Sequence, residues 1–311
     1  MSLKFLLVPI LVLSATWASA EPPKLAFQPA GEGLYDFDTG LFKGRLKVDG
    51  KYQGVYPLID RATGTDLTPP PGVFSPYRVL TTNRRYGNAA RDWPTETRLL
   101  DSGGVEAHWP PAEEHPLEMT AVYRWTASDT LDLEVAVKPQ QAMPCFELFV
   151  SSYFAKGFRA SVYLPGDGGK PAGFVPVDRP PDSLGGYVMF PRDEAASRMI
   201  RDGRWTIPPS PVDWAMPRHF AAPLALRRDE TQDLTALMMC PPGDCFAVSS
   251  PWNPDTPEAG GYRSLYLSLL GRDLKAGETG RARCRLILRR HLTNDGAVRC
   301  YREYSARSIS D

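Results

Sequence analysis

Hydrophobic and polar residues alternate along much of this chain with a period of two. The clearest run, residues 130–137 (TLDLEVAV), places an aliphatic side chain at every odd position from Leu131 to Val137 and polar side chains at Asp132 and Glu134. This is the period of a β-strand with one face buried and the other face in water. The segment Leu117–Trp125 alternates in the same way, and the Ala-Ser-Asp sequence that separates the two is typical of a turn. We predict that the two segments form a β-hairpin.

Short segments of the same kind recur along the chain, separated by Gly, Pro and Asp, and this spacing predicts an all-β fold, a sandwich of antiparallel sheets. Helical patterns are scarce: one or two short helices are expected, at Asp193–Arg201 and Ala297–Tyr304. Residues 166–182 are expected to form a long loop, and no repeat or linker divides the chain. The further predicted strands are Phe42–Val48, Gln53–Leu58, Arg98–Leu100, Val105–Trp109, Phe146–Phe154, Arg159–Leu164, Gly186–Phe190, Pro223–Leu226, Leu234–Met239, Phe246–Val248, Tyr262–Leu269 and Arg281–Leu288.

The N-terminus has the three parts of a secretory signal peptide. Lys4 supplies the positive charge, Phe5–Leu13 is an unbroken apolar run, and Ala18-Ser19-Ala20 is the small-residue pattern that signal peptidase cleaves. The apolar run is too short to span a bilayer, which disfavours the alternative of an uncleaved anchor. We predict a signal peptide at 1–20 and a single exported β-sandwich domain at 21–311, in the periplasm or outside the cell.

The charge balance excludes two classes of partner. Lys and Arg together number 36, and so do Asp and Glu, so the chain has no net charge. Nucleic acids and anionic membranes both select a surplus of basic residues. We therefore expect neither of them as the main partner.

Five cysteines allow two interpretations. Cys240 and Cys245 flank a Pro-Pro-Gly-Asp turn and could pair, Cys284 could pair with Cys300, and Cys145 would then remain as a buried free thiol. Alternatively, all five are reduced core residues, because a domain of this size needs no disulfides. The chain has only four His and no paired CxxC motif, so neither a metal site nor a cofactor is expected.

Two stretches resemble the galactose-mutarotase-like superfamily. Residues 146–154 (FELFVSSYF) resemble the segment in which a mutarotase strand ends in Asn-His-x-Tyr-Phe, with Tyr153 and Phe154 matching the final pair, and residues 274–286 (LKAGETGRARCRL) resemble the closing Pro-Gly-Glu-Thr turn and last strand. The resemblance spans about residues 40 to 290 in layout. It implies a β supersandwich that handles carbohydrate.

The sequence departs from the mutarotase pattern at both catalytic histidines. Ser151 stands where a mutarotase has its catalytic His, and no second His occurs in a Gly-rich strand turn upstream. A serine hydroxyl cannot act as an acid near neutral pH as imidazole does. The resemblance therefore does not imply aldose 1-epimerase activity.

The segment 213–219 (DWAMPRH) combines side chains that a sugar site uses. The Trp214 indole could stack on the apolar face of a pyranose, Asp213 and Arg218 could bind hydroxyl groups, and His219 could act as an acid or base. In the alternative interpretation Trp214 is a core residue, Arg218 is a surface charge and His219 is structural.

A second cluster, residues 81–93 (TTNRRYGNAARDW), interleaves three arginines with aromatic residues. Arg84, Arg85 and Arg91 beside Trp93 would suit a uronate or a sulfated sugar, because guanidinium binds these anions with two hydrogen bonds. The alternative is a solvated loop whose arginines pair with nearby acidic residues. The resemblance adds Tyr153 as a candidate catalytic residue, since a tyrosine beside an arginine can act as a base.

These observations predict an exported protein that binds an oligo- or polysaccharide, with an acidic one favoured by the arginine cluster, and that could act on it as a lyase or hydrolase. Two alternatives stay open. The first is a non-catalytic binding or structural module of the cell envelope, which the missing mutarotase histidines favour. The second is a metal-dependent hydrolase that uses His219 with acidic residues, which the small number of histidines disfavours. The sequence does not decide whether the protein is an enzyme.

Overall fold

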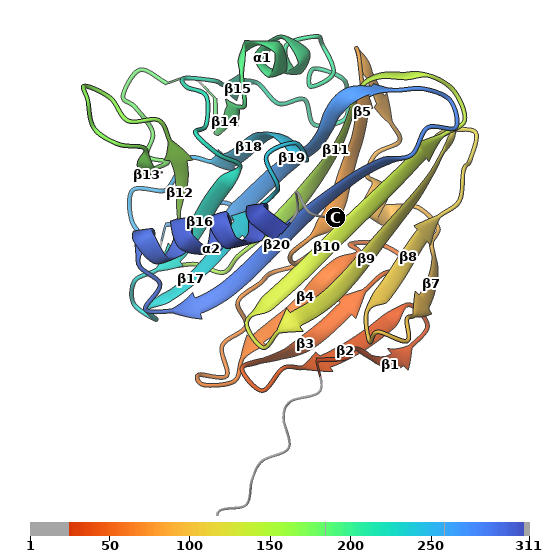
Figure 1. The fold of residues 1–311 in the computed structure, drawn as a ribbon, viewed down its shortest axis with the longest axis horizontal. Helices are drawn as coiled ribbons and strands as arrows, with labels where there is room; N and C mark the ends of the chain where they lie inside the picture. The colour runs from red at the N-terminus through yellow and green to blue at the C-terminus, as the bar shows by residue number, and fades with distance from the viewer. Residues whose placement is uncertain (1–24, 184, 258, 308–311) are drawn as a thin grey trace, which may run out of the picture.

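Three sheets, antiparallel except for one pair of edge strands, form the framework of the computed structural model, which describes residues 25–183, 185–257 and 259–307 (Figure 1). The predicted signal peptide lies outside these residues. The nine-stranded sheet has the order β13 (Gly173–Pro176), β12 (Arg159–Leu164), β16 (Leu224–Asp229), β17 (Leu234–Met239), β20 (Gly280–Arg290), β10 (Thr130–Pro139), β9 (Leu117–Ala127), β8 (Val105–Trp109), β7 (Glu96–Leu99). The seven-stranded sheet has the order β15 (Trp214–Ala215), β14 (Tyr187–Pro191), β18 (Cys245–Pro251), β19 (Ser264–Leu274), β11 (Met143–Tyr153), β5 (Ser75–Thr81), β6 (Arg84–Tyr86). The four-stranded sheet runs β1 (Gln28–Gly31), β2 (Leu34–Asp38), β3 (Phe42–Lys47), β4 (Gly54–Asp60).

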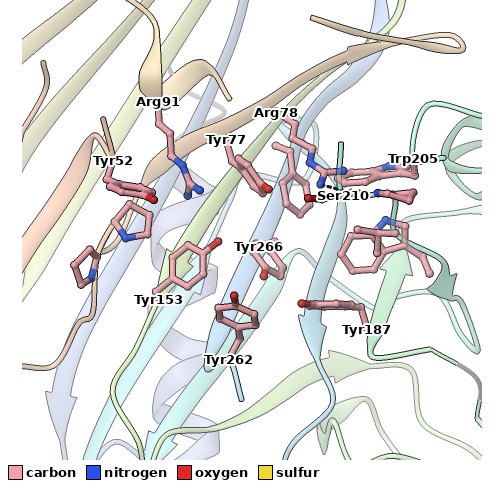
Figure 2. A pocket seen from close by; sticks show the side chains of 16 residues that line it. Tyr52, Tyr77, Arg78, Arg91, Tyr153, Tyr187, Trp205, Ser210, Tyr262 and Tyr266 are labelled. Atoms are coloured by element: carbon pink, nitrogen blue, oxygen red, sulfur yellow. Dashed lines mark hydrogen bonds between the residues drawn. The ribbon is translucent and has the colours of Figure 1, made fainter. Parts of the chain in front are cut away.

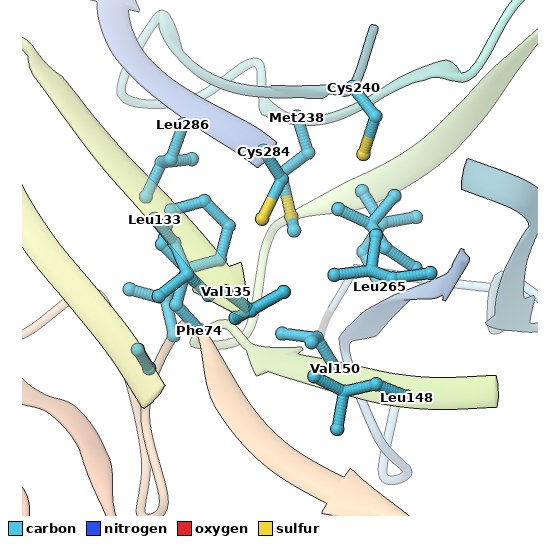
Figure 3. Close-up of a cluster of buried hydrophobic side chains, with 14 of the residues drawn as sticks. Phe74, Leu133, Val135, Leu148, Val150, Met238, Cys240, Leu265, Cys284 and Leu286 are labelled. Atoms are coloured by element: carbon cyan, nitrogen blue, oxygen red, sulfur yellow. The ribbon is translucent and has the colours of Figure 1, made fainter. Parts of the chain in front are cut away.

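The two larger sheets pack face to face, and the alternation of the strands explains why. In β10 the odd positions from Leu131 to Val137 are buried, while Asp132 and Glu134 point outward. The opposing sheet contributes Leu148 and Val150 of β11 and Leu265 of β19 to the same core (Figure 3). Strands with one apolar face must bury that face against another layer, which produces the sandwich.

The predicted hairpin is present. β9 and β10 pair antiparallel from Leu117 opposite Pro139 to Arg124 opposite Asp132. All the segments predicted as strands appear as strands within a few residues of their expected bounds, and the all-β sandwich of antiparallel sheets is confirmed. The strands that the sequence did not indicate are β1, β2, β5, β6, β13 and β15.

Both predicted helices are present. α2 (Asn294–Arg307) lies across the outer face of the nine-stranded sheet, where Leu292, Ala297 and Tyr304 pack on Leu237 and Ile287 (Figure 1). The short α1 (Glu194–Ile200) lies beside β14, at the edge of the seven-stranded sheet. The expected long loop at 166–182 contains β13 as a short edge strand.

Asp193 caps α1, because its carboxylate accepts a hydrogen bond from the backbone nitrogen of Ala196 at 2.8 Å. We expect Asp193→Ala to lower the free energy of unfolding by about 1 kcal/mol, the usual contribution of such a cap. Denaturant unfolding measures the change. Glu194→Ala is the matched control: Glu194 lies 3.8 Å from Arg198 in an exposed pair, and its loss should change stability by less than about 0.5 kcal/mol. Equal effects of the two substitutions would contradict the cap.

The five cysteines are free thiols in this structure. Cys240, Cys245 and Cys284 are buried, and burial together with the neighbouring thiols of Cys245 and Cys284 raises the pKa of Cys240. The structure therefore agrees with the interpretation of reduced core residues and contains neither predicted pair. The expectation for Cys145 was wrong in one respect, since this thiol is half-buried in a residue with a φ of 50° at the start of β11.

Candidate functional site

A pocket of about 550 Å³ opens on the face of the seven-stranded sheet that points away from the core (Figure 2). Its volume lies within the range of small-molecule sites, about 300–1,000 Å³. Aromatic rings dominate the lining, and none of its described residues is Asp, Glu, His or Lys. The lining consists of Tyr52, Pro70, Pro71, Tyr77, Arg78, Arg91, Phe149, Tyr153, Tyr187, Trp205, Ser210, Pro211, Val212, Trp214, Tyr262 and Tyr266.

Strand alternation places the pocket floor. On β11, Phe149 and Tyr153 face the pocket, whereas Leu148 and Val150, on either side of Phe149, face the core. Ser151, on the same side as Phe149, is buried beneath the pocket and its hydroxyl donates to the backbone oxygen of Ser75 at 3.2 Å. Ser151, which the resemblance places at the mutarotase histidine position, thus has a buried structural hydrogen bond.

A β-bulge in β5 brings two adjacent residues to the pocket. Arg78 pairs with Phe149 and Pro76 pairs with Val150, so Tyr77 has no partner on β11. An extra residue in one strand breaks the alternation of side chains and redirects them. Tyr77 and Arg78 consequently both line the pocket although they are neighbours in sequence (Figure 2).

One wall of the pocket is formed by the segment 201–216, which contributes Trp205 and Trp214. Their rings lie 5.1 Å apart and edge-to-face, and Trp205 packs at 4.8 Å against Phe149. The preceding residue, Arg204, is fully buried and anchors this segment to the sheet. Its guanidinium donates to Glu147 at 3.1 Å and to Asp202 at 2.8 Å.

Arg78 is the most unusual group in the pocket. Its side chain is 2% exposed, and its Nη2 donates to the backbone oxygen of Ser210 at 2.8 Å. The other two guanidinium nitrogens, Nε and Nη1, have no hydrogen-bond partner. A buried donor without a partner costs about 1–3 kcal/mol, and more for a charged group, so such a group in a pocket points to a ligand that completes it.

Arg91 reaches the pocket from the 3₁₀ helix η1 (Ala90–Asp92). Its Nε and Nη1 likewise lack partners, and its Cζ lies 4.3 Å from the centre of the Tyr77 ring and 5.5 Å from that of Tyr52. Contacts with ring faces hold a guanidinium in place and leave its N–H groups free for another acceptor.

The positive charge of the site is not neutralised. Within residues 25–183, 185–257 and 259–307, no carboxylate forms an ion pair with Arg78, Arg85, Arg91 or Arg227. Burial and the nearby Arg78 charge lower the pKa of Arg85 to about 10. Burial lowers the pKa of Arg227 to about 9. Shifts of this direction are those of cations that lack an opposite charge.

Arg227 extends this charge beneath the floor. It is fully buried and donates to the backbone oxygen of Ser264 at 2.7 Å, and the Ser264 hydroxyl lies 2.6 Å from the hydroxyl of Tyr266 in the pocket. An anion in the pocket would be stabilised by this cation as well as by Arg78 and Arg91.

Tyr77 differs electrostatically from the other buried tyrosines of the site. Burial raises its pKa, but the adjacent Arg78 and the charges of Arg91 and Arg85 lower it by more, so that the net pKa is below the usual value. Burial raises the pKa of Tyr187 and Tyr266.

The structure brings three of the predicted site residues together in the pocket. Tyr153, Trp214 and Arg91 all line it, and Figure 2 shows Arg91 across from Tyr153. They come from segments far apart in sequence, and each belonged to a different candidate cluster.

The other predicted residues of the cluster at 81–93 lie outside the pocket. Arg84 is exposed and lies 4.5 Å over the ring of Tyr86. Arg85 donates to the backbone oxygens of Pro209 and Asn88 behind the pocket wall. Trp93 is buried and stacks at 3.8 Å on the ring of His115.

The remaining residues of the cluster at 213–219 also lie elsewhere. Asp213 is exposed beside a shallow depression on the other side of Trp214. Arg218 pairs with Asp167 at 3.0 Å. His219 is exposed, with its Nε2 at 3.2 Å from the hydroxyl of Ser197.

Sequence reasoning missed several residues of the site. Tyr77 and Arg78 lie in β5, whose sequence SPYRVLT does not alternate cleanly, and the bulge that directs them is a property of strand pairing. Tyr52, Trp205 and Tyr262 belong to loops without a local signal beyond their aromatic character.

The described residues contain neither a membrane-spanning helix nor a cluster of metal ligands. No helix there is long and apolar enough to cross a membrane. No group of three His, Cys, Asp or Glu side chains in the same residues is arranged to hold a metal ion.

Comparison with known proteins returns similarity at the level of the fold. No family model and no curated protein matches the chain. It is similar to a provisionally assigned aldose 1-epimerase of Escherichia coli, at 14% identity over 83% of this chain and 99% of that one, with a TM-score of 0.49. A Synechocystis protein shows 14% identity over 88% and 100% of the two chains, with a TM-score of 0.49. Galactose 1-epimerase of Lactobacillus acidophilus is 10% identical over 83% of this chain and 95% of that one, with a TM-score of 0.45. Two of these three structures are described as aldose or galactose 1-epimerases.

Proposed function

We propose that this protein binds an acidic oligo- or polysaccharide in the aromatic pocket on the seven-stranded sheet. The observation that carries the proposal is Arg78, a buried guanidinium with two free nitrogens that point to a missing acceptor. Arg91 presents two more free nitrogens on the same pocket. A carboxylate or sulfate is the acceptor that fits a guanidinium fork, since it takes two parallel hydrogen bonds.

The aromatic lining favours a sugar as the carrier of that anion. Indole and phenol rings offer flat apolar faces for the C–H groups of a pyranose, and the phenol hydroxyls can bind its hydroxyl groups. Figure 2 shows the hydroxyl ends of Tyr77, Tyr153, Tyr262 and Tyr266 directed toward a common space. The pocket therefore combines stacking surfaces, hydroxyl partners and a site for negative charge.

The pocket is elongated, which favours a chain over a single sugar. Tyr52 marks one end and Trp205 the other, with Tyr153 and Tyr262 between them (Figure 2). Tyr52 is 53% exposed and Tyr262 is 62% exposed, and both are large apolar side chains that water does not favour. Exposed aromatic residues at the rim of a pocket provide further stacking positions for neighbouring sugar units.

A binding panel tests this function. We expect uronate and sulfated oligosaccharides to raise the melting temperature of the purified protein, while neutral oligosaccharides of equal length raise it much less. Ligand at 100 times its Kd stabilises the native state by about 2.7 kcal/mol, which amounts to several degrees for a chain of this size. Isothermal titration then gives the affinities. Equal responses to neutral and acidic sugars, or none to either, would contradict the proposal.

We also propose that the ligand is met outside the cytoplasm, in the periplasm or beyond the cell. The support is the charged, apolar and small-residue pattern of residues 1–20, which predicts a signal peptide. N-terminal sequencing of the protein from its native cells should begin at Glu21. A chain that begins at Met1 would contradict export by cleavage.

A further inference from the structure

We propose that the pocket cleaves a uronate-containing polysaccharide by β-elimination, with Tyr77 as the base. This activity rests on the acidic-sugar binding proposed above and adds a reaction to it. The carboxylate of the uronate would bind Arg78 and Arg91, which places the carbon next to it beside Tyr77.

The groups that line the pocket favour this reaction class over hydrolysis. Glycoside hydrolysis generally uses two carboxylates, one as acid and one as base or nucleophile. Among residues 25–183, 185–257 and 259–307, the lining contains no Asp or Glu, and it contains no His that could replace them. The side chains there that can exchange a proton are hydroxyls, mainly those of tyrosine. Elimination needs only a base and a group that stabilises the carboxylate as charge moves onto it.

Tyr77 is the tyrosine whose surroundings suit a base. The Cζ atoms of Arg91 and Arg78 lie 4.3 Å and 5.0 Å from its ring centre. Burial is the largest single influence and raises the Tyr77 pKa, but Arg78, Arg91 and Arg85 together lower it by more, so that the net Tyr77 pKa falls. The charged and titratable groups around it are Arg78 from β5, Arg85 from β6, Arg91 from η1 and Tyr187 from β14.

The proposed step conserves atoms and electrons. The Tyr77 phenolate removes the proton from C5 of the uronate, and the electron pair of that bond spreads onto the carboxylate held by Arg78 and Arg91. The pair then forms a double bond between C4 and C5 while the bond from C4 to the glycosidic oxygen breaks. The leaving oxygen takes the proton from Tyr77, which restores the phenolate. The products are an unsaturated uronate and a sugar with a free hydroxyl, and no oxidant or further reactant is consumed.

The test is cleavage of uronate polymers by the purified protein and its Tyr77→Phe variant. Polygalacturonate, alginate and hyaluronan serve as probes, and the ultraviolet absorbance of the conjugated double bond reports the product. We expect product from at least one polymer, and a decrease of kcat by at least about 100-fold in Tyr77→Phe with unchanged affinity for the oligosaccharide, because the ring and its contacts with both arginines remain. Tyr301→Phe, on α2 at the outer face of the other sheet, is the matched control and should retain full activity.

The pH dependence separates a base from a merely structural tyrosine. The rate should rise with pH through the pKa of Tyr77, because the phenolate is the active form. In Arg91→Met this rise should move to higher pH, because the loss of a positive charge raises the pKa of the tyrosine.

Each contrary outcome identifies what fails. Binding of uronate oligosaccharides without an unsaturated product would overturn the elimination and leave the binding function standing. Absence of binding to every acidic sugar would overturn the binding function itself. Full activity in Tyr77→Phe with loss in Tyr153→Phe would overturn the assignment of the base.

Discussion

Replacement of Arg78 by methionine should lower the affinity for an acidic oligosaccharide by about 30-fold or more. Arg78 is the buried member of the arginine pair, and two of its nitrogens are free for the ligand. Truncating one partner of a buried, hydrogen-bonded charge pair costs about 2–5 kcal/mol, and each 1.4 kcal/mol corresponds to tenfold in Kd. Methionine keeps much of the volume of the side chain and therefore limits changes in packing. Isothermal titration with the oligosaccharide that shifts the melting temperature most provides the measurement.

A lysine at the same position refines this expectation. Arg78→Lys keeps the charge and loses the planar fork, so its affinity should fall between those of the native protein and Arg78→Met. The matched control is Arg84→Met, since Arg84 is an exposed arginine of the neighbouring strand that contacts the ring of Tyr86 and does not line the pocket. Equal losses in Arg78→Met and Arg84→Met would show that general positive charge, and not the buried site, binds the anion.

The strands were predictable wherever one face of the strand is buried and the other is exposed to solvent. β9 and β10 alternate over their whole lengths, and both appear with nearly the expected bounds. β5 was not predicted because Arg78, a charged residue, is buried within it and because Tyr77 bulges out of register. Both departures from the β pattern occur at the functional site, where a buried charge and a redirected side chain serve binding and not packing.

The candidate site was only partly predictable, because residues close in sequence do not necessarily share a face. Asp213 and Trp214 are neighbours, yet Trp214 lines the pocket and Asp213 faces solvent beyond it. Arg84 and Arg85 alternate in the short strand β6, and neither reaches the pocket. The pocket is lined by one or two residues from each of many segments. Strand pairing between segments far apart in sequence brings these residues together.

Composition indicated the chemistry of the pocket better than it indicated the residues that line it. The arginine and aromatic content of 81–93 predicted an acidic sugar, and the pocket has this chemistry, but it takes only Arg91 from that cluster. Tyr153 was a candidate because residues 146–154 resemble a mutarotase segment. The alternation of β11 places its side chain on the face that forms the pocket. The local sequence therefore indicated the chemistry of the pocket. The bulge in β5 places Tyr77 and Arg78 there, and the loop anchored by Arg204 places Trp205 there.

The wall that carries Trp205 depends on a buried cluster of charges whose members are not equivalent. Arg204 contacts Glu147 and Asp202, and Ser268 donates to Glu147 at 2.7 Å. Glu147 and Arg204 are both fully buried. Burial raises the pKa of Glu147 against the opposing effects of Arg204 and Ser268. Two carboxylates thus share one guanidinium, so that the loss of Arg204 leaves two negative charges unpaired, whereas the loss of the Glu147 charge leaves Arg204 paired with Asp202.

We therefore expect Arg204→Met to lower the free energy of unfolding by about 3–5 kcal/mol, the usual cost of breaking a buried pair, and Glu147→Gln to lower it by much less. The melting temperature of Arg204→Met should fall by about 6–20 °C. Arg45→Met, which breaks the exposed pair of Arg45 with Asp36, is the control and should cost about 0–1 kcal/mol.

The pH dependence of Arg204→Met provides a check on the electrostatic origin of this loss. Without Arg204 the folded state favours protonated Glu147, so the folded protein binds more protons than the unfolded chain and its stability increases as pH falls through the folded pKa. The deficit of Arg204→Met relative to the native protein should accordingly be smaller at pH 5 than at pH 8. Denaturant unfolding at the two pH values measures it. A deficit independent of pH would assign the loss to packing around Trp205, because only an unpaired carboxylate can recover stability by taking up a proton.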